Sequence, residues 1–380
     1  MIYLDSGATT LEKPPAVARA MAQAVGEMSS PGRGNYPASQ KAARTAYDCR
    51  EAAAELFHVP APEQVIFTCN ATHGLNIAIR TLVRPGCRVA VSGYEHNAVT
   101  RVLHSIPGVE IMVADAPLFR PEQTLEGFRT ALRRGVDAVI CNHVSNVFGC
   151  VQPVEELAGL CRRTHTPLIV DAPQSAGILP VLLADWGAAF VAMPGHKGLY
   201  GPQGTGLLLC GAEASPLLYG GTGSASRRQT MPIDLPDRLE AGTHNMPGIA
   251  GLLEGLRFVS HAGVERIAQW ERRLTRRAEE GLARLPGVEV FADKTGQGQT
   301  GVLSFCVKGM DCEQVGEELA RRQIAVRAGL HCAPLAHRTA GTLKSGTIRI
   351  SPSVFNTEGQ INFFLREMRE ILRENTKKSV

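Results

Sequence analysis

An apolar run that ends in a lysine, Phe190-Val191-Ala192-Met193-Pro194-Gly195-His196-Lys197-Gly198, is the most informative stretch of the chain. The chain contains 8 lysines and 32 arginines, and Lys197 is the one lysine that directly follows a strand of buried character. A second such strand, Leu168-Ile169-Val170-Asp171, ends in a carboxylate 26 residues earlier. Because parallel strands present their carboxyl ends at one edge of a sheet, we expect the amine and the carboxylate to meet there.

An amine and a carboxylate in this arrangement suit a pyridoxal phosphate site. Its lysine must lose a proton easily to form a Schiff base, and the pyridine nitrogen needs an acidic partner. We assign Lys197 and Asp171 to these roles, and Gln174 could donate to the phenolate oxygen. Taken alone, Asp171 is also typical of a helix N-cap or of a structural ion pair.

Strand and helix patterns alternate along most of the chain. Strands are predicted at residues 65–68, 88–91, 109–113, 138–141, 168–171 and 188–193. Helices are predicted after Pro14-Pro15 and at residues 42–57, 74–83 and 154–164. A loop-rich stretch (220–248) is followed by long helical patterns (249–285) and by short strands at 302–305 and 348–350. This order predicts a large α/β domain with a mostly parallel sheet, then a smaller α+β domain.

The segment Thr68-Cys69-Asn70-Ala71-Thr72-His73-Gly74 is a candidate phosphate site, because a strand passes into a helix there. Free amides and the positive dipole end of a helix attract phosphate, and the Thr72 hydroxyl would add a bond. Ordinary helix capping explains the same residues. The pattern Gly201-x-x-Gly204-x-Gly206 follows the lysine and opens no βαβ unit, so we do not assign it to a dinucleotide.

Two further strand ends carry polar side chains. His96, in Tyr94-Glu95-His96-Asn97, could stack on a flat cofactor ring and take part in proton transfer. A lone loop histidine is also typical of a surface or structural position. Asn146 follows the next strand together with His143, and its amide could bond both the ring and the substrate.

The segment Arg327-Ala328-Gly329-Leu330-His331-Cys332-Ala333-Pro334 places a cysteine in a loop rich in Gly and Pro. Cationic Arg327, His331 and His337 would favour the thiolate of Cys332, which is the reactive form. Two alternatives remain, a packed structural cysteine and a metal site formed by His331, Cys332 and His337. A fourth ligand at normal spacing is missing, so we expect no metal.

Arg349 lies in a short apolar strand, Gly346-Thr347-Ile348-Arg349-Ile350-Ser351. A buried guanidinium is costly unless it is paired, and a substrate carboxylate could pair it in bidentate fashion. An internal salt bridge would satisfy it equally well.

The composition bounds the remaining possibilities. The net charge is +4 with scattered basic residues, and 5% of residues are aromatic, so we do not expect a nucleic-acid partner. No apolar stretch approaches membrane-spanning length and no leader pattern opens the sequence. The ten cysteines form no Cys-x-x-Cys pair and fall mostly in apolar runs, which predicts a reducing, cytoplasmic location.

Taken together, these segments resemble the class V aminotransferase superfamily, fold type I of the pyridoxal phosphate enzymes. Within it they are most similar to group II cysteine desulfurases, which include selenocysteine lyases. The likeness runs from Leu4-Asp5-Ser6-Gly7 to Arg349-Ile350-Ser351, and Arg327-x-Gly329-x-His331-Cys332-Ala333 is its most specific element. It implies a seven-stranded large domain over residues 16–260. The small domain, residues 1–15 and 261–380, would carry Cys332 and Arg349.

The resemblance implies how the cofactor ring is held. Lys197 would bind the cofactor covalently, Asp171 would contact the pyridine nitrogen, and Gln174 the phenolate oxygen. His96 would stack on the ring and Asn146 would border it.

It also implies how the phosphate and the subunits are arranged. Ala71, Thr72 and His196 would hold the phosphate, with Gly242 and Thr243 reaching it from the partner subunit of a homodimer. Pro194 stands where the family usually has a hydroxyl residue, and His73 where an acidic residue is common. These two departures concern cofactor affinity rather than the reacting atoms.

The implied activity is desulfuration of L-cysteine to alanine. Arg349 and Asn146 would hold the substrate carboxylate, and Cys332 would take the sulfur as a persulfide for an acceptor protein. The alternatives are a selenocysteine lyase, a C–S lyase for a cysteine conjugate, and a regulator that binds the cofactor without turnover.

Overall fold

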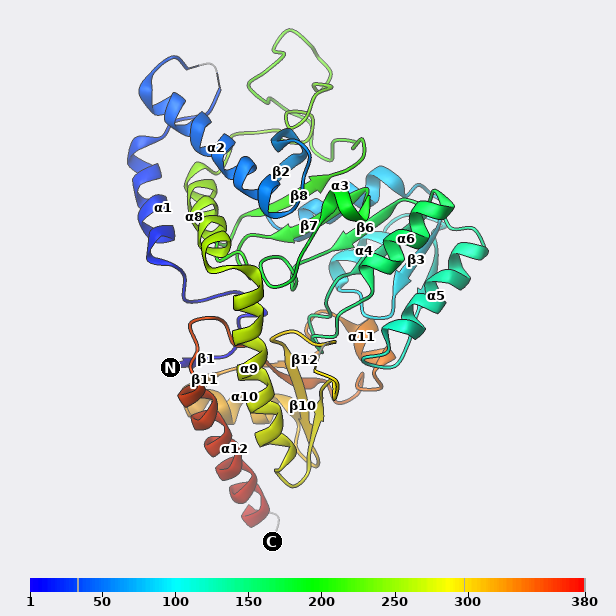
Figure 1. Ribbon diagram of the computed structural model, residues 1–380, viewed down its shortest axis with the longest axis vertical. Coiled ribbons are helices and arrows are strands. Elements are labelled where there is room, and N and C mark those ends of the chain that lie inside the picture. The colour runs from blue at the N-terminus through cyan, green and yellow to red at the C-terminus, as the bar shows by residue number, and fades with distance from the viewer. Residues whose placement is uncertain (33, 297, 379–380) are drawn as a thin grey trace.

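A computed structural model describes residues 1–32, 34–296 and 298–378 (Figure 1). Its largest sheet has seven strands in the order β2-β8-β7-β6-β5-β3-β4. These are β2 (Val65–Thr68), β3 (Arg88–Ser92), β4 (Glu110–Ala114), β5 (Ala138–Asn142), β6 (Leu168–Asp171), β7 (Phe190–Pro194) and β8 (Gly206–Cys210). Only β8 runs antiparallel to its neighbours. The predicted, mostly parallel sheet is therefore confirmed, although the sequence pattern had not identified β8 as a strand.

Helices cover both faces of this sheet. The helices of this part are α1 (Pro15–Glu27), which packs on α8, and α2 (Pro37–Leu56), α3 (Ala71–Leu82), α4 (Asn97–His104), α5 (Pro121–Arg133), α6 (Val154–Thr164), α7 (Leu183–Trp186) and α8 (Met246–Ala262), with a 3₁₀ turn at Pro62–Gln64. The core residues of α3 and α4 lie on one face, and those of α2, α5, α6 and α8 lie on the other.

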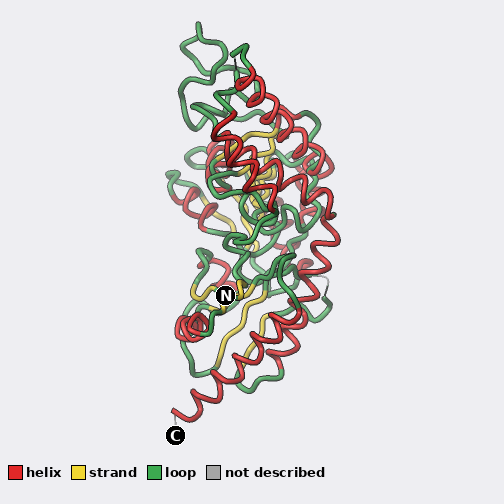
Figure 2. Tube along the Cα trace, turned by 90° about the vertical axis from the view of Figure 1, so that its left-hand side faces the viewer, coloured by secondary structure: helices red, strands yellow, loops and turns green. Residues whose placement is uncertain are grey.

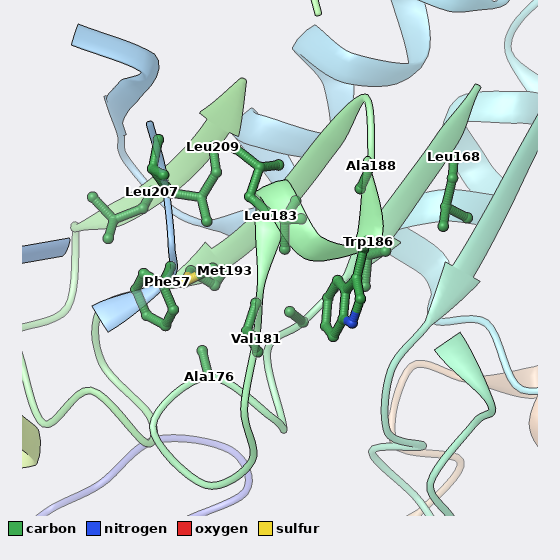
Figure 3. Packing of buried hydrophobic residues seen from close by; sticks show 14 of the residues in the cluster. Phe57, Leu168, Ala176, Val181, Leu183, Trp186, Ala188, Met193, Leu207 and Leu209 are labelled. Carbon is green, nitrogen blue, oxygen red and sulfur yellow. The ribbon is translucent and has the colours of Figure 1, made fainter. Parts of the chain in front are cut away.

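The side chains of each strand point alternately into these two cores. In β7, Val191 and Met193 pack into one core, whereas Phe190 and Ala192 pack into the other. Successive side chains of a strand point to opposite faces, so a strand buried on both sides must be apolar throughout. Figure 3 shows part of one face, with Met193, Leu207 and Leu209 of the sheet beside Phe57, Val181 and Leu183.

A second sheet forms the other part of the molecule, below the first in Figures 1 and 2. Its order is β12-β13-β10-β9, with β9 (Val288–Phe291), β10 (Leu303–Val307), β12 (Arg327–Gly329) and β13 (Thr347–Ile350). The helices of this part are α9 (Val264–Ala283), α10 (Cys312–Arg321), α11 (Pro334–Thr339) and α12 (Glu358–Lys378). At the N-terminus, β1 (Ile2–Tyr3) pairs with β11 (Ile324–Ala325). The first residues of the chain thus join the part built mainly by the last third.

Two loop regions agree with the sequence patterns. Between Cys210 and Met246 the described chain forms neither helix nor strand, as the stretch rich in Gly and Pro predicts. Gly201 and Gly204 lie in the connection between the antiparallel strands β7 and β8, and Gly206 begins β8, which is incompatible with a dinucleotide-binding βαβ turn. Among the described helices, none combines the length and the apolar character needed to cross a membrane.

Gly255 tests how closely α8 packs on the loop after Lys197, and Gly159, a glycine of α6, serves as the control. A Cβ at Gly255 would lie 2.2 Å from the carbonyl oxygen of Leu199, whereas a Cβ at Gly159 of α6 meets only Arg163, at 3.6 Å. Ala is favoured over Gly in a helix by about 1 kcal/mol, and overpacking costs about 1–3 kcal/mol. We expect Gly255→Ala to lower the thermal unfolding midpoint by about 1–3 °C, and Gly159→Ala to leave it unchanged or raise it. Equal midpoints for the two variants would contradict this packing.

Candidate active site

A cavity of about 210 Å³ opens at the carboxyl edge of the large sheet. Five strands, β2, β3, β5, β6 and β7, deliver its lining residues from the segments at or just beyond their ends. These residues include Asn70, Ala71, Thr72, His96, Asn142, Asn146, Asp171, Gln174, Pro194, His196 and Lys197. The predicted convergence of polar side chains at strand ends is therefore observed, as expected for a ligand site in a parallel sheet.

Lys197 and Asp171 line the same cavity and influence each other's charge. Burial, together with the charge of Arg349, lowers the pKa of Lys197 to about 8, while Asp171 opposes the change. Burial raises the pKa of Asp171 to about 7, and Lys197 opposes that rise. One oxygen of Asp171, Oδ1, is buried and has no hydrogen-bond partner among the described residues. No described helix begins at Asp171, so the N-cap alternative is wrong.

A second buried acid, Glu95, lies behind the cavity wall. Its Oε1 accepts hydrogen bonds from the Ser92 hydroxyl (2.6 Å) and the Asn142 N–H (2.7 Å). Burial, followed by the charge of Asp171, raises the pKa of Glu95 to about 8. Glu95 is not among the candidate residues that the sequence patterns indicate. A charged residue just beyond a buried strand is the one feature of the sequence that points to it.

The N-terminus of α3 borders one end of the cavity. Asn70 caps the helix by accepting from the His73 N–H at 2.9 Å, so the capping explanation is correct for that residue. Thr72 is exposed, and its hydroxyl makes no hydrogen bond within the described part of the chain. The Nδ1 atom of His196 is likewise buried without a described partner. A dipole end, a hydroxyl and an imidazole nitrogen thus remain available for an anion.

His96 is the N-cap residue of α4. Its Nδ1 accepts a hydrogen bond from the Ala98 N–H at 3.0 Å. Burial, with the charge of Lys197, lowers the pKa of His96 to about 4. The ring is therefore neutral near pH 7 and carries its proton on Nε2, because Nδ1 is used as an acceptor.

Gln174 connects the cavity to the N-terminal residues. Its Nε2 donates to the carbonyl oxygen of Gly7 at 2.8 Å, which leaves the second amide proton for another acceptor. Nearby, the carbonyl of His196 accepts from the Thr10 N–H at 3.0 Å and from the Thr10 hydroxyl at 3.1 Å. The first ten residues therefore help to position two cavity residues.

Cys332 is exposed, and of the ten cysteines it shares this property only with Cys69. His331 and Cys332 both adopt the left-handed region, with φ of 49° and 55°. Such backbone costs about 1–3 kcal/mol per residue and persists only where the surroundings impose it. The Asn97 N–H donates to the Cys332 carbonyl at 2.8 Å, and Asn146 Nδ2 donates to the His331 carbonyl at 2.8 Å. These bonds dock the cysteine loop against neighbours of the cavity, although Cys332 is not among its described lining residues.

The expected effect of the two nearby histidines on Cys332 is wrong. His331 and His337 are buried, and burial lowers the pKa of both, to about 4 for His337 and further for His331. Both rings are therefore neutral near pH 7 and supply no positive charge. His331 Nε2 lies 3.1 Å from the Thr347 hydroxyl and His337 Nδ1 lies 2.8 Å from that of Thr342. Within the described residues no group of three or more His, Cys, Asp or Glu could hold a metal ion.

Arg349 is buried and already paired. Its Nη2 donates to Asp5 Oδ1 at 2.9 Å, and its Nη1 donates to the backbone carbonyl of Asn146 at 2.7 Å. The internal salt bridge considered from the sequence is thus present. Its Nε has no hydrogen-bond partner in the part of the chain that the structure describes. We had not selected Asp5 as a site residue, because nothing in the local sequence connects it to Arg349.

Gly242 and Thr243 are exposed and line a different cavity, so one chain does not bring them to the site. Glu240, just before them, is buried and pairs with Arg50 through bonds of 2.8 and 2.6 Å. The His244 ring lies 2.6 Å from the same carboxylate. The segment that carries Gly242 and Thr243 is therefore firmly anchored at both sides.

The cavity lining fits pyridoxal phosphate. The α3 N-terminus with Thr72 and His196 suits the phosphate, and the unpartnered Asp171 oxygen suits a pyridinium proton. Lys197, with its lowered pKa, suits a bond to the aldehyde. Each functional group of the cofactor thus has a chemically matched residue.

Comparison with known proteins agrees with this geometry. A probable cysteine desulfurase from Methanothermobacter thermautotrophicus is 32% identical over 97% of this chain and 94% of its own length. Another from Mycolicibacterium paratuberculosis is 32% identical over 98% of this chain, which spans 55% of that relative's length.

Solved structures show the same likeness. The apo cysteine desulfurase from Thermococcus onnurineus NA1 superposes with a TM-score of 0.90 at 30% identity, covering 98% of this chain and 95% of that one. The cysteine desulfurase CsdA from Escherichia coli gives 0.85 at 27% identity, covering 98% and 94%. The model of the aminotransferase class V family matches residues 2–364. The chain therefore belongs to the aminotransferase class V family, whose enzymes depend on pyridoxal phosphate.

Proposed function

We propose that the protein is a cysteine desulfurase, which converts L-cysteine to alanine and leaves a persulfide on Cys332. The observation that carries this proposal is the exposed Cys332 thiol on a strained loop, hydrogen-bonded to Asn97 and Asn146 beside the Lys197 cavity. Relatives over nearly the whole chain bear the name cysteine desulfurase.

Within the cavity we assign Lys197, Asp171, Gln174 and His96 to the cofactor ring, with Asn146 at its border. Ala71, Thr72 and His196 are assigned to the phosphate. When bound, pyridoxal phosphate supplies an aldehyde that condenses with amines and a ring that accepts electrons. Asp171 favours this role by holding a proton on the pyridine nitrogen.

The chain's own residues provide the proton transfers and the orientation. The lowered pKa of Lys197 makes its amine a competent base for the Cα proton of the substrate. Arg349, with its unpartnered Nε, and Asn146, whose Oδ1 is also unpartnered among described residues, border the place for the substrate's polar end. The neutral His96 can donate a proton from Nε2.

The sulfur transfer balances without an external oxidant. The thiolate of Cys332 attacks the substrate sulfur, so an S–S bond forms as the C–S bond breaks. The electron pair of the C–S bond ends in a C–H bond of alanine, and Cys332 becomes the persulfide. The persulfide then passes its sulfur to an acceptor, which we propose to be a protein or a thiol.

We also propose a homodimer in which Gly242 and Thr243 reach the partner's phosphate. Their anchoring by Glu240 and their exposure support this. The break between α8 and α9 at Gly263, and a separate core around the second sheet, support a large domain of residues 16–260 and a small one of 1–15 and 261–380. Ten free cysteines support a reducing, cytoplasmic location.

The role of Cys332 can be tested against the other exposed cysteine. We expect Cys332→Ala to retain the cofactor absorbance but to lose most alanine formation from L-cysteine, because no thiol remains to take the sulfur. Cys69→Ala should retain both, since Cys69 is exposed but lies just before α3, on a different segment from the loop that Asn97 and Asn146 hold. Normal alanine production by Cys332→Ala would refute the assignment, and selenocysteine as a second substrate would reveal a lyase that needs the thiol less.

The pKa of Lys197 predicts how fast apoprotein captures its cofactor. Only the neutral amine condenses with an aldehyde, and a pKa of about 8 leaves it mostly protonated at pH 7. The capture rate, followed by absorbance after mixing with pyridoxal phosphate, should rise about tenfold per pH unit below pH 8 and level off above it. A rise that continues to pH 10 would show an ordinary lysine.

A further inference from the structure

The N-terminal residues are fixed between the two parts of the molecule. β1 pairs in parallel with β11, and Asp5 forms a bridge with Ser351, just beyond β13. The Ser6 N–H donates to the Ser351 carbonyl at 3.0 Å, and the Gly7 N–H donates to the Ser351 hydroxyl at 2.7 Å. The backbone of Asp5 is therefore held in place, which sets the position of its side chain.

The carboxylate of Asp5 binds two arginines at once. Arg349 Nη2 donates to Oδ1 at 2.9 Å, and Arg327 donates to Oδ2 through Nη2 at 2.9 Å and through Nε at 3.1 Å. The Arg349 side chain is 2% exposed and that of Asp5 10%, whereas that of Arg327 is 49% exposed. Asp5 is thus the anion that compensates a fully buried guanidinium.

From Asp5 two routes lead to the same loop. Through Arg349 the route passes to the Asn146 carbonyl (2.7 Å), and the Asn146 side chain donates to the His331 carbonyl (2.8 Å). Through Arg327 it follows the backbone of β12, which leads directly to Cys332. The two routes form a closed circuit of contacts, which includes both Arg349 and the cysteine loop.

We propose that Asp5 is a positioning residue, which sets Arg349 and the Cys332 loop relative to each other through one shared carboxylate. The inference rests on the proposed function, because it assigns Arg349 to the substrate and Cys332 to the sulfur. Its physical basis is that a single anion between two guanidinium groups fixes both at once, so that neither moves without the other.

The charges near Cys332 give the proposal a second consequence. Arg327 and Cys332 interact electrostatically, and Asp5 raises the pKa of Arg327 through its hydrogen bonds. When Asp5 is made neutral, the positive charge of Arg327 is no longer compensated on the segment that leads to Cys332. The loop also loses one of its anchors, which makes the thiol more accessible to an alkylating reagent.

The test compares Asp5→Asn with the unmodified holoenzyme. We expect iodoacetamide to alkylate Cys332 at least threefold faster in the variant, as measured by mass spectrometry of the peptide that contains it. We expect kcat on L-cysteine to fall about tenfold or more, because misplaced reacting groups are severely penalised. The cofactor absorbance should be retained, since Asp5 does not line the cofactor cavity.

Glu358→Gln is the matched control. Glu358 also lies within salt-bridge distance of two arginines, Arg273 at 2.5 Å and Arg277 at 3.5 Å, but it begins α12 and has no contact with the cysteine loop among its described bonds. In the Glu358→Gln variant, the rate of Cys332 alkylation and kcat on L-cysteine should equal those of the wild type. The proposal is overturned when Asp5→Asn leaves both quantities within twofold of wild type, or when Glu358→Gln changes them equally.

A second variant covers the case in which Asp5→Asn does not fold. Arg327→Lys retains the charge at a half-exposed position but loses the two-bond contact with Asp5. It should also speed alkylation of Cys332, and an unchanged rate would contradict the proposal. Alkylation of Cys332 needs no turnover, so the alkylation rates test the positioning role even if the proposed function is wrong. A wild-type protein that forms no alanine from L-cysteine would refute the proposed function alone.

Discussion

The withdrawal of one amine and one carboxylate from water at adjacent strand ends is the constraint on which this structure depends. Lys197 and Asp171 meet because β6 and β7 are parallel neighbours. Burial moves both pKa values toward neutrality, and each charge partly stabilises the other. The large sheet, buried on both faces, supplies the low-dielectric surroundings that this pair requires.

The second sheet and the N-terminal residues add the groups of the site that the large sheet does not supply. The sheet positions residues for the cofactor, but both Arg349 and Cys332 come from the last third of the chain. The first ten residues link the two parts, because Gly7 bonds Gln174 on one side while Asp5 bonds Arg349 on the other. A segment that no strand-and-helix pattern identifies as important therefore contacts both the cavity residue Gln174 and Arg349.

Much of the architecture could be predicted because its causes are local. The apolar runs at 65–68 and 168–171 coincide with β2 and β6, and the periodicity at 154–164 coincides with α6. β8 was missed, although Leu207–Cys210 is as apolar as the runs that were identified, and its antiparallel direction between β2 and β7 follows only from the tertiary pairing. The predicted positive charge of His331 and His337 was wrong. The protonation state of a histidine depends on its burial, and sequence proximity to Cys332 says nothing about burial.

The sequence by itself determined the chemistry that is available, namely a lysine and an aspartate at strand ends, a helix N-terminus for an anion and a cysteine in a tight loop. Residue type and periodicity suffice for these features, since each arises within a few consecutive residues. Only the tertiary structure decided that Asp5 pairs with Arg349, 344 residues away, and that Asn97 and Asn146 hold the cysteine loop. Such contacts follow from the packing of whole elements, so no local pattern can specify them.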